Sequence, residues 1–407
     1  MTFPAPNSNL APKAGTELAD RGHNPSPSFR NSERIPELDG LRGLAIFMVI
    51  LYHYIGYPPH GASHTWPSRI GTILGQGATG VDLFFVLSGF LIGGILLGTR
   101  ESPRYYRTFY LRRFHRIIPL YYGWILLFGF LWLVARKWGG PAGADFSTVT
   151  PYWAYFLFLQ NYFFGSTAVQ AYWLIPTWSL AVEEQFYLLA PPLIRNLSKG
   201  RLATLLAAVV VLSLALRIYL SIAFGPHHGD WGIFAAYFWT PSRADDLALG
   251  VLAAIVWSYP QAKQWIQQNV KYFYALLCMF AAALLVMLYW LVNPSSLVSA
   301  TYGRSIYGLL FVSLLLVLLA DRTSPLATVF RWSPLRELGK ISYCVYIIHG
   351  AVIWTLFRFS RHSEPRFDTW PAIGLSVAAF FATIAIAELS WRFFEHPLIR
   401  RGHRYHY

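Results

Sequence analysis

The sequence has 407 residues, of which 55% are hydrophobic and only 13% are charged, and its formal net charge is +14. Soluble domains carry about 25% charged residues, so this composition excludes an ordinary soluble enzyme and indicates a membrane protein. The basic residues lie in short runs between apolar segments, as membrane topology requires, so the net charge does not indicate nucleic-acid binding. Cys278 and Cys344 both lie in apolar runs, and no metal site is predicted.

The chain is predicted to have a leader, a membrane domain and a tail. Residues 1–34 are polar and rich in proline and predict a disordered cytoplasmic leader. Over 35–399, apolar segments recur at the length of about 20 residues that crosses a bilayer. We therefore predict an all-α membrane protein with about ten transmembrane helices, ending in a basic cytoplasmic tail over 400–407. The expected spans are 40–57, 79–98, 117–135, 176–194, 202–224, 234–257, 272–292, 304–320, 341–359 and 370–391.

One further segment, 151–164, is apolar and aromatic but too short to cross a bilayer. Arginines before the third span and basic residues after the fourth both predict cytoplasmic loops, which must be separated by an even number of crossings. The spans 117–135 and 176–194 supply two crossings, so 151–164 is predicted to be re-entrant or interfacial. The same reasoning places both termini in the cytoplasm.

The first span carries Arg42 near its cytoplasmic end and His53 eleven residues later. In an α-helix this spacing puts both side chains on one face, about 16 Å apart along the axis. Taken alone, a snorkelling arginine and a core histidine bonded to a carbonyl would explain them. Ionisable residues inside spanning helices are nevertheless costly, and they are therefore candidates for function.

Two later segments add further polar groups. Asp82 and Ser88 lie in the second span. Arg113 and Arg116 are three residues apart, so they share a helix face just before the third span. Guanidinium pairs in that position suit the recognition of phosphate groups.

The fourth and sixth spans carry charges of both signs. Glu183 and Glu184 are adjacent, so they point to different faces and at most one needs to face a cavity. Arg243 could form a buried structural ion pair with the aspartates Asp245 and Asp246, or Arg243 and Asp245 could line a cavity, and the sequence leaves both interpretations open.

A histidine, a carboxylate and arginines around one cavity would suit the transfer of an acyl group to a hydroxyl. An imidazole takes the proton of the alcohol, a carboxylate holds the imidazole tautomer, and arginines hold a phosphorylated acyl carrier. A proton-coupled transporter uses similar residues, so this chemistry alone does not separate the two classes.

Six motifs, in order along residues 34–399, make the chain resemble the acyltransferase 3 family of integral membrane O-acyltransferases. Each motif is weak alone, and their shared order carries the resemblance. The matching residues are Arg42 and His53; Ser88 to Leu91; Phe109, Tyr110, Arg113, Arg116, Ile117 and Pro119; Trp178, Ser179, Leu180, Glu183, Phe186 and Tyr187; Arg243, Asp245, Leu247 and Gly250; and Ile341 to Tyr343, His349, Glu395 and Pro397.

The resemblance implies an enzyme of the bacterial inner membrane that takes an acyl group, expected to be acetyl, from cytosolic acyl-CoA. It also implies an extracytoplasmic hydroxyl as acceptor, mostly on carbohydrate such as the O-antigen of lipopolysaccharide or an exopolysaccharide. His53 is predicted as the general base, with a transient acyl-imidazole as an open alternative, and Glu183 as its orienting carboxylate. Arg42, Arg113 and Arg116 are predicted to bind the CoA phosphates.

Six further residues are predicted to line the substrate cavity: Asp82, Ser88, Arg243, Asp245, Tyr343 and His349. Two alternatives stay open. The acceptor could be a macrolide, a lipid or a small metabolite, and the chemistry would be the same. A proton-coupled transporter is disfavoured, because such folds often have paired halves and no similarity between the halves is visible here.

Overall fold

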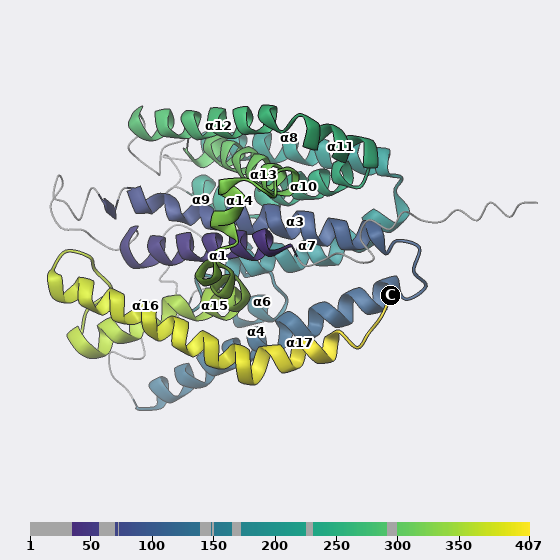
Figure 1. The fold of residues 1–407 in the computed structure, drawn as a ribbon. Helices are drawn as coiled ribbons and strands as arrows, with labels where there is room; N and C mark the ends of the chain where they lie inside the picture. The colour runs from purple at the N-terminus through teal and green to yellow at the C-terminus, as the bar shows by residue number, and fades with distance from the viewer. Residues whose placement is uncertain are drawn as a thin grey trace, which may run out of the picture.

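The structure is a computed structural model, and it describes residues 35–56, 70–71, 73–138, 148, 150–164, 172–224, 231–290 and 299–407. These residues form helices joined by turns, with no strand among them (Figure 1). The predicted all-α class is confirmed for this part of the chain. The predicted leader, 1–34, lies outside the described residues.

The helices and helical turns follow one another along the chain. In order they are α1 (Pro36–Leu51), η1 (Tyr52–Gly56), η2 (Gly75–Thr79), α3 (Gly80–Gly98), α4 (Tyr105–Trp138), α6 (Tyr152–Phe156), η3 (Gln160–Tyr162), α7 (Thr177–Asn196), α8 (Lys199–Ala223), α9 (Trp231–Phe238), α10 (Thr240–Trp257), α11 (Pro260–Gln268), α12 (Val270–Trp290), η5 (Ser299–Gly303), α13 (Arg304–Ala320), α14 (Pro325–Phe330), α15 (Ser333–Arg361), α16 (Trp370–Ser390), η6 (Trp391–Glu395) and α17 (His396–Gly402).

Within the described ranges, eight helices are long and apolar enough to cross a membrane, so the chain is a multi-pass membrane protein. Two of the ten predicted spans are not among them, and the count of ten is not confirmed. The predicted span 176–194 is helical as α7, and most of 234–257 is helical as α10. Neither contains a stretch that is apolar enough to count among the eight, because α7 carries two glutamates and α10 carries an arginine and two aspartates.

The short segment 151–164 does not cross the bundle, in agreement with the prediction. It contains only the five-residue helix α6 and the turn η3. Gln185 of α7 binds it, because its Nε2 donates to the carbonyl oxygen of Phe158 at 2.7 Å and to Asn161 Oδ1 at 3.0 Å. Such contacts satisfy the irregular backbone of the segment, which is the condition for its placement at membrane depth.

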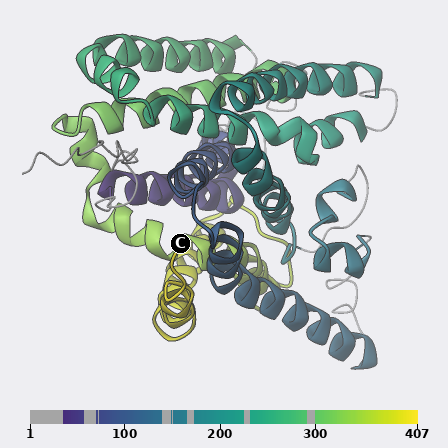
Figure 2. The same cartoon turned by 90° about the vertical axis from the view of Figure 1, so that its right-hand side faces the viewer.

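Helix α3 lies at the centre of the bundle, where it packs against α10, α1, α13 and α7 (Figures 1 and 2). Glycine allows the closest of these approaches. A Cβ atom on Gly89 would lie 2.2 Å from the carbonyl oxygen of Leu247, so a larger residue would push α3 and α10 apart. The neighbouring Ser88 is thereby held at a fixed depth in the bundle.

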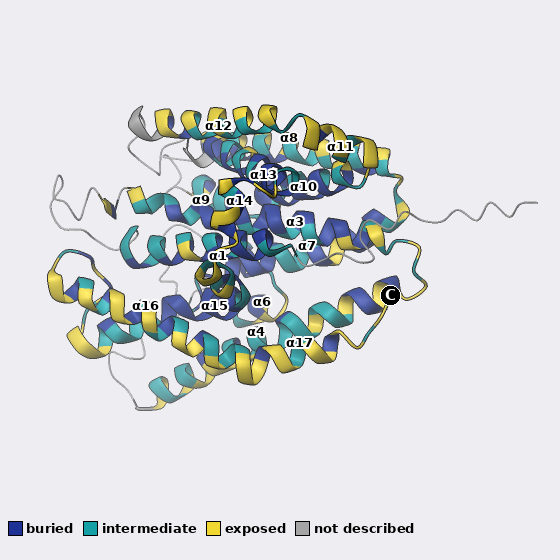
Figure 3. Ribbon diagram, in the orientation of Figure 1, coloured by how far each residue is buried: buried dark blue, intermediate teal, exposed yellow. Residues whose placement is uncertain are grey.

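The outer helices surround this centre. Helix α15 packs between α1 and α16, and α17 lies along α4. Figure 3 shows exposed residues along α12 and α16, whereas α1, α3 and α15 are largely buried. In a membrane protein the exposed apolar side chains, such as Leu285 and Phe381, face lipid. The buried helices α1, α3 and α15 carry part of the polar lining of the site, and α4 and α7 carry the rest.

Candidate active site

A cavity lies among α1, α3, α4, α7 and α15, with about 700 Å³ of empty space, part of it open to solvent. Six of the eleven predicted site residues line it. The polar side chains of its lining are Arg42, Ser88, Arg113, Arg116, Ser179, Glu183, Tyr187, Ser342, Tyr343 and Tyr346.

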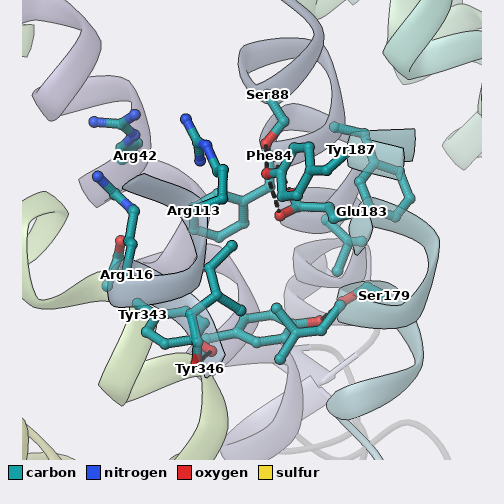
Figure 4. A pocket seen from close by; sticks show the side chains of 15 residues that line it. Arg42, Phe84, Ser88, Arg113, Arg116, Ser179, Glu183, Tyr187, Tyr343 and Tyr346 are labelled. Atoms are coloured by element: carbon teal, nitrogen blue, oxygen red, sulfur yellow. Dashed lines mark hydrogen bonds between the residues drawn. The ribbon is translucent and has the colours of Figure 1, made fainter. Parts of the chain in front are cut away.

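One end of the cavity is cationic. Figure 4 shows the guanidinium groups of Arg42, Arg113 and Arg116 gathered there. Arg42 Nη1 lies 3.4 Å from a carboxylate oxygen of Asp39. Among the described residues, neither Arg113 nor Arg116 has a carboxylate within ion-pair distance. Because α4 runs unbroken through both residues, their three-residue spacing puts them on one face, as the sequence predicts.

A hydrogen-bonded group of hydroxyls surrounds Glu183 beside this cationic end (Figure 4). The Ser88 hydroxyl donates to Glu183 Oε1 at 2.8 Å, and the Tyr187 hydroxyl donates to Glu183 Oε2 at 2.9 Å. Tyr187 was named only as a motif residue in the sequence. Its spacing of four residues from Glu183, which places the two side chains together on a helix, is the signal that could have found it.

The other end of the cavity is formed by tyrosines of α15. The hydroxyl of Tyr343 donates to the carbonyl oxygen of Ile117 at 2.8 Å. The hydroxyl of Tyr346 lies 2.5 Å from that of Ser179. The Tyr346 ring is also 5.9 Å, between centroids, from the ring of His349, which lies one turn further along α15. This end of the cavity therefore adjoins a histidine.

His53 lies in the π-helical turn η1, at the end of α1. Turns of this kind are rare and frequently occur at functional sites. Its Nδ1 lies 2.9 Å from the carbonyl oxygen of Val49. A carbonyl can only accept, so in the neutral ring Nδ1 carries the hydrogen and Nε2 has a free lone pair. His53 thus has the tautomer that a general base acting through Nε2 needs.

The structure does not bring Glu183 to His53. In the described part of the chain, both oxygens of Glu183 are taken by Ser88 and Tyr187, and the carbonyl of Val49 occupies the position predicted for an orienting carboxylate. His53 is also not in the lining of the cavity. It contacts His349 instead, with 4.7 Å between the ring centroids.

Four of the six predicted cavity residues lie elsewhere. His349 is fully buried behind Tyr346, and Asp82, Arg243 and Asp245 belong to a buried cluster of ion pairs. Only Ser88 and Tyr343 line the cavity.

The ion pair of Arg243 with the neighbouring aspartates forms through Asp246, with 3.6 Å between Arg243 Nη2 and Asp246 Oδ2, whereas Asp245 pairs with another arginine. Arg243 Nη2 lies 2.8 Å from Asp82 Oδ1, and Asp245 Oδ2 lies 2.6 Å from Arg217 Nη2. Residues two apart on a helix do not face each other, so Arg243 and Asp245 reach partners on different neighbouring helices. Arg304 completes the cluster, 3.0 Å from Asp82. Arg217 was missed, although its position inside a predicted span is itself a signal.

Comparison with known proteins shows to which family the chain belongs. The family model described as an acyltransferase domain, of the acyltransferase 3 type, matches residues 35–392. The chain belongs to this family. The resemblance found in the motifs is therefore confirmed, and no solved structure matches the chain.

Several curated relatives of this acyltransferase are named for O-acetylation. It is 32% identical to the peptidoglycan O-acetyltransferase OatA of Listeria monocytogenes, over 90% of this chain and 56% of that protein. It is 30% identical to the putative peptidoglycan O-acetyltransferase YrhL of Bacillus subtilis, over 91% of this chain and 56% of that protein. It is 28% identical to the O-acetyltransferase OatA of Staphylococcus aureus, over 90% of this chain and 58% of that protein. The chain thus spans just over half the length of these relatives.

Proposed function

We propose that this acyltransferase is an O-acetyltransferase of the inner membrane, with both termini in the cytoplasm. It transfers an acetyl group from cytosolic acetyl-CoA to a hydroxyl of an extracytoplasmic glycan. Membership of the family supports acyl transfer. The names of the relatives support acetyl as the group and a cell-wall glycan, such as peptidoglycan, as the acceptor.

The observation that carries the proposal is the cationic end of the cavity. Coenzyme A is a polyanion with a diphosphate and a further phosphate, and guanidinium groups bind phosphate oxygens through paired, charge-assisted hydrogen bonds. Arg113 and Arg116 have no carboxylate at ion-pair distance in the described part of the chain, so their donors are available to a ligand. Both residues follow the arginine-rich start of α4, which the positive-inside rule assigns to the cytoplasm.

His53 is the general base of this proposal. It lies on the same helix as Arg42, about 16 Å further along the axis if the whole segment is taken as α-helix, so the phosphates and the thioester of one extended donor can reach the two residues together. The Nε2 of His53 takes the proton of the acceptor hydroxyl as its oxygen bonds to the thioester carbonyl carbon. The carbon–sulfur bond then breaks, and the proton passes from His53 to the departing thiolate.

Glu183 contributes to the same site in another way. It accepts hydrogen bonds from Ser88 and Tyr187, and so holds two hydroxyls beside the arginines. A carboxylate near three guanidinium groups also lessens their mutual repulsion. Its role in this proposal is therefore to hold the side chains of the donor-binding end of the cavity in place.

The experiment is deletion of the gene in the source organism, followed by measurement of base-labile acetate in the extracted surface glycans and of glycan mass. Acetate is expected to disappear from one glycan fraction and to return with the wild-type gene but not with His53→Ala. His362→Ala is the matched control, because this histidine is exposed at the C-terminal end of α15. Unchanged acetate in every glycan fraction of the deletion strain, or full activity of His53→Ala, would contradict the proposal.

A further inference from the structure

The segment 403–407, which follows α17, is bound along the first turns of α4. Arg112 donates from Nε and from Nη2 to the carbonyl oxygen of Tyr405, at 2.9 and 2.7 Å. The hydroxyl of Thr108 donates to the carbonyl oxygen of His406 at 2.9 Å. Figure 1 shows the end of the chain beside the start of α4. Two parts of the chain that are 293 positions apart are therefore joined here.

Aromatic rings complete this contact. The guanidinium group of Arg112 lies over the ring of Tyr407, 5.1 Å from its centroid. The ring of Tyr405 lies 5.8 Å, between centroids, from that of His115. Tyr407 also packs against a buried apolar cluster to which α3, α4 and α7 contribute. The segment 403–407 therefore contacts both the start of α4 and the core of the bundle, and it links the two.

The residues that bind this segment lie beside those that face the cavity. Thr108 and Arg112 are four residues apart, so they share one face of α4, and Arg113 and Arg116 share another. Successive residues of an α-helix are rotated by about 100°, so the two faces are adjacent. None of the residues 403–407 lines the cavity. The segment thus holds α4 from the side and leaves the cationic end of the cavity open.

Helix α4 has a weak point just after these residues. Pro119 lies inside the helix. It has no N–H, so the carbonyl of His115 loses its bond within the helix, and sharp bends of helices are found mostly at proline. The part of α4 before Pro119 is therefore not held in place by the rest of α4 alone. Its contacts with other elements, including the segment 403–407, decide where its guanidinium groups lie.

We propose that Arg112 is a positioning residue of the donor site. By binding the segment 403–407, it holds the start of α4 in the position in which Arg113 and Arg116 face the phosphates of the donor. The inference rests on the proposed function, in which these two arginines bind the coenzyme A phosphates. A guanidinium group binds a phosphate through two parallel hydrogen bonds of fixed geometry, so a small shift of the helix weakens binding.

The test compares two donors in membranes that contain the glycan fraction which loses acetate in the deletion strain. One donor is acetyl-CoA, and the other is S-acetylpantetheine, a thioester without phosphate groups. We expect Arg112→Met to raise the KM for acetyl-CoA about tenfold, the effect of weakening one hydrogen bond to a charged group. Both kcat and the kcat/KM for S-acetylpantetheine should stay within about twofold of wild type, because the phosphate contacts alone are disturbed.

Arg107→Met is the matched control, because it removes the same charge from an exposed position on the same helix. Screening by solvent and salt makes an exposed charge weak, so its KM for acetyl-CoA should stay within about twofold of wild type. An unchanged KM for acetyl-CoA in Arg112→Met would overturn the inference. An equal loss in Arg107→Met, or equal losses with both donors in Arg112→Met, would overturn it too.

Tyr407→Ala tests the same contact from the other side, because it removes the ring beside the guanidinium group and keeps the charge of Arg112. It is expected to raise the KM for acetyl-CoA about threefold, the effect of one cation–π contact. In the double variant, Tyr407→Ala should add almost nothing to Arg112→Met, because both act through one contact. Losses that add would show that Arg112 acts on the donor directly, and they would overturn the inference.

Two further outcomes separate this inference from the proposed function. If Arg112→Met does not accumulate, Tyr407→Ala takes its place in the comparison of the two donors. A wild-type enzyme that uses acetyl-CoA and S-acetylpantetheine equally well would refute the recognition of phosphate in the proposed function. A wild-type preference for acetyl-CoA that persists unchanged in Arg112→Met refutes only the inference.

Discussion

Two groups of arginines lie inside this bundle, and they differ in what surrounds them. In the ion-pair cluster of α3, α8, α10 and α13, Arg243 is bound to Asp82 and Arg217 to Asp245, at 2.8 and 2.6 Å. In the cavity, Arg113 and Arg116 have no such carboxylate in the described ranges, and they border open space. The positive charges of the first group are neutralised by aspartates of the protein, whereas those of the second group are available to an anionic ligand.

The difference shows how a membrane protein separates stability from binding. A buried charge without a partner costs several kcal/mol, so a cluster that holds four helices together must be neutralised internally. A site for a polyanion must instead leave its guanidinium groups without acidic partners. Four substitutions test this distinction.

Arg217→Met removes one partner of a fully buried ion pair and leaves Asp245 uncompensated. Breaking such a pair costs about 3–5 kcal/mol, so the variant is expected to lose most of its folded protein in detergent. Thermal unfolding and the yield of monodisperse protein measure this loss. Cys278→Ser, at an exposed position, is the control. A wild-type melting temperature for Arg217→Met would show that the cluster does not hold the fold.

Arg113→Gln removes a cavity arginine that has no acidic partner. The loss of one hydrogen-bonded charge from a phosphate site is worth about 1.5–3 kcal/mol, so acetyl-CoA should bind roughly tenfold to a hundredfold more weakly. Calorimetric titration of the purified protein measures the affinity. Arg107→Gln is the matched control, because this arginine is exposed on the same helix. Equal affinity in wild type and Arg113→Gln would remove this residue from the donor site.

Tyr187→Phe deletes the hydroxyl that donates to Glu183 Oε2 and keeps the ring beneath Arg113. A single hydrogen bond contributes about 1 kcal/mol, so a modest fall in unfolding free energy is expected. The acetyl-CoA affinity should change less than in Arg113→Gln. A loss of affinity as large as that of the arginine variant would mean that the hydroxyl itself binds the donor.

Arg116→Gln is expected to raise the stability of the protein slightly, although it weakens binding. Like charges three residues apart on a helix repel by about 0.2–0.5 kcal/mol, and this substitution removes the repulsion between Arg113 and Arg116. The melting temperature without ligand should therefore equal or exceed that of wild type. A clear fall would place Arg116 among the structural arginines.

Much of the fold could be predicted from the sequence, because apolar length and arginine-rich loops are local signals. The short segment 151–164 was recognised by its length and by the charges of the loops around it, and the shared face of Arg113 and Arg116 by helical spacing. The number of membrane spans was harder to predict. Helices α7 and α10 are shielded by the rest of the bundle, so their polar content does not follow the rule for lipid-facing helices.

The partners of the polar groups could not be predicted in the same way. The sequence left open whether Arg243 pairs with the neighbouring aspartates, and the cluster also joins residues 222 positions apart, as in Arg304 with Asp82. Similarly, the chemistry of acyl transfer and the family resemblance joined His53 to Glu183, whereas His53 contacts the backbone of Val49 and the ring of His349. Side-chain partners inside a bundle depend on how its helices cross, and the pattern of a single helix does not contain that information.

The most direct test of the distinction between paired and unpaired arginines is one paired measurement on Arg116→Gln and Arg304→Gln. Each purified variant is titrated with acetyl-CoA and then melted without ligand. We expect Arg116→Gln to lose affinity and keep its melting temperature, and Arg304→Gln, which loses an ion pair to Asp82, to melt at a lower temperature. Normal acetyl-CoA affinity in Arg116→Gln, or equal losses of stability in both variants, would contradict it.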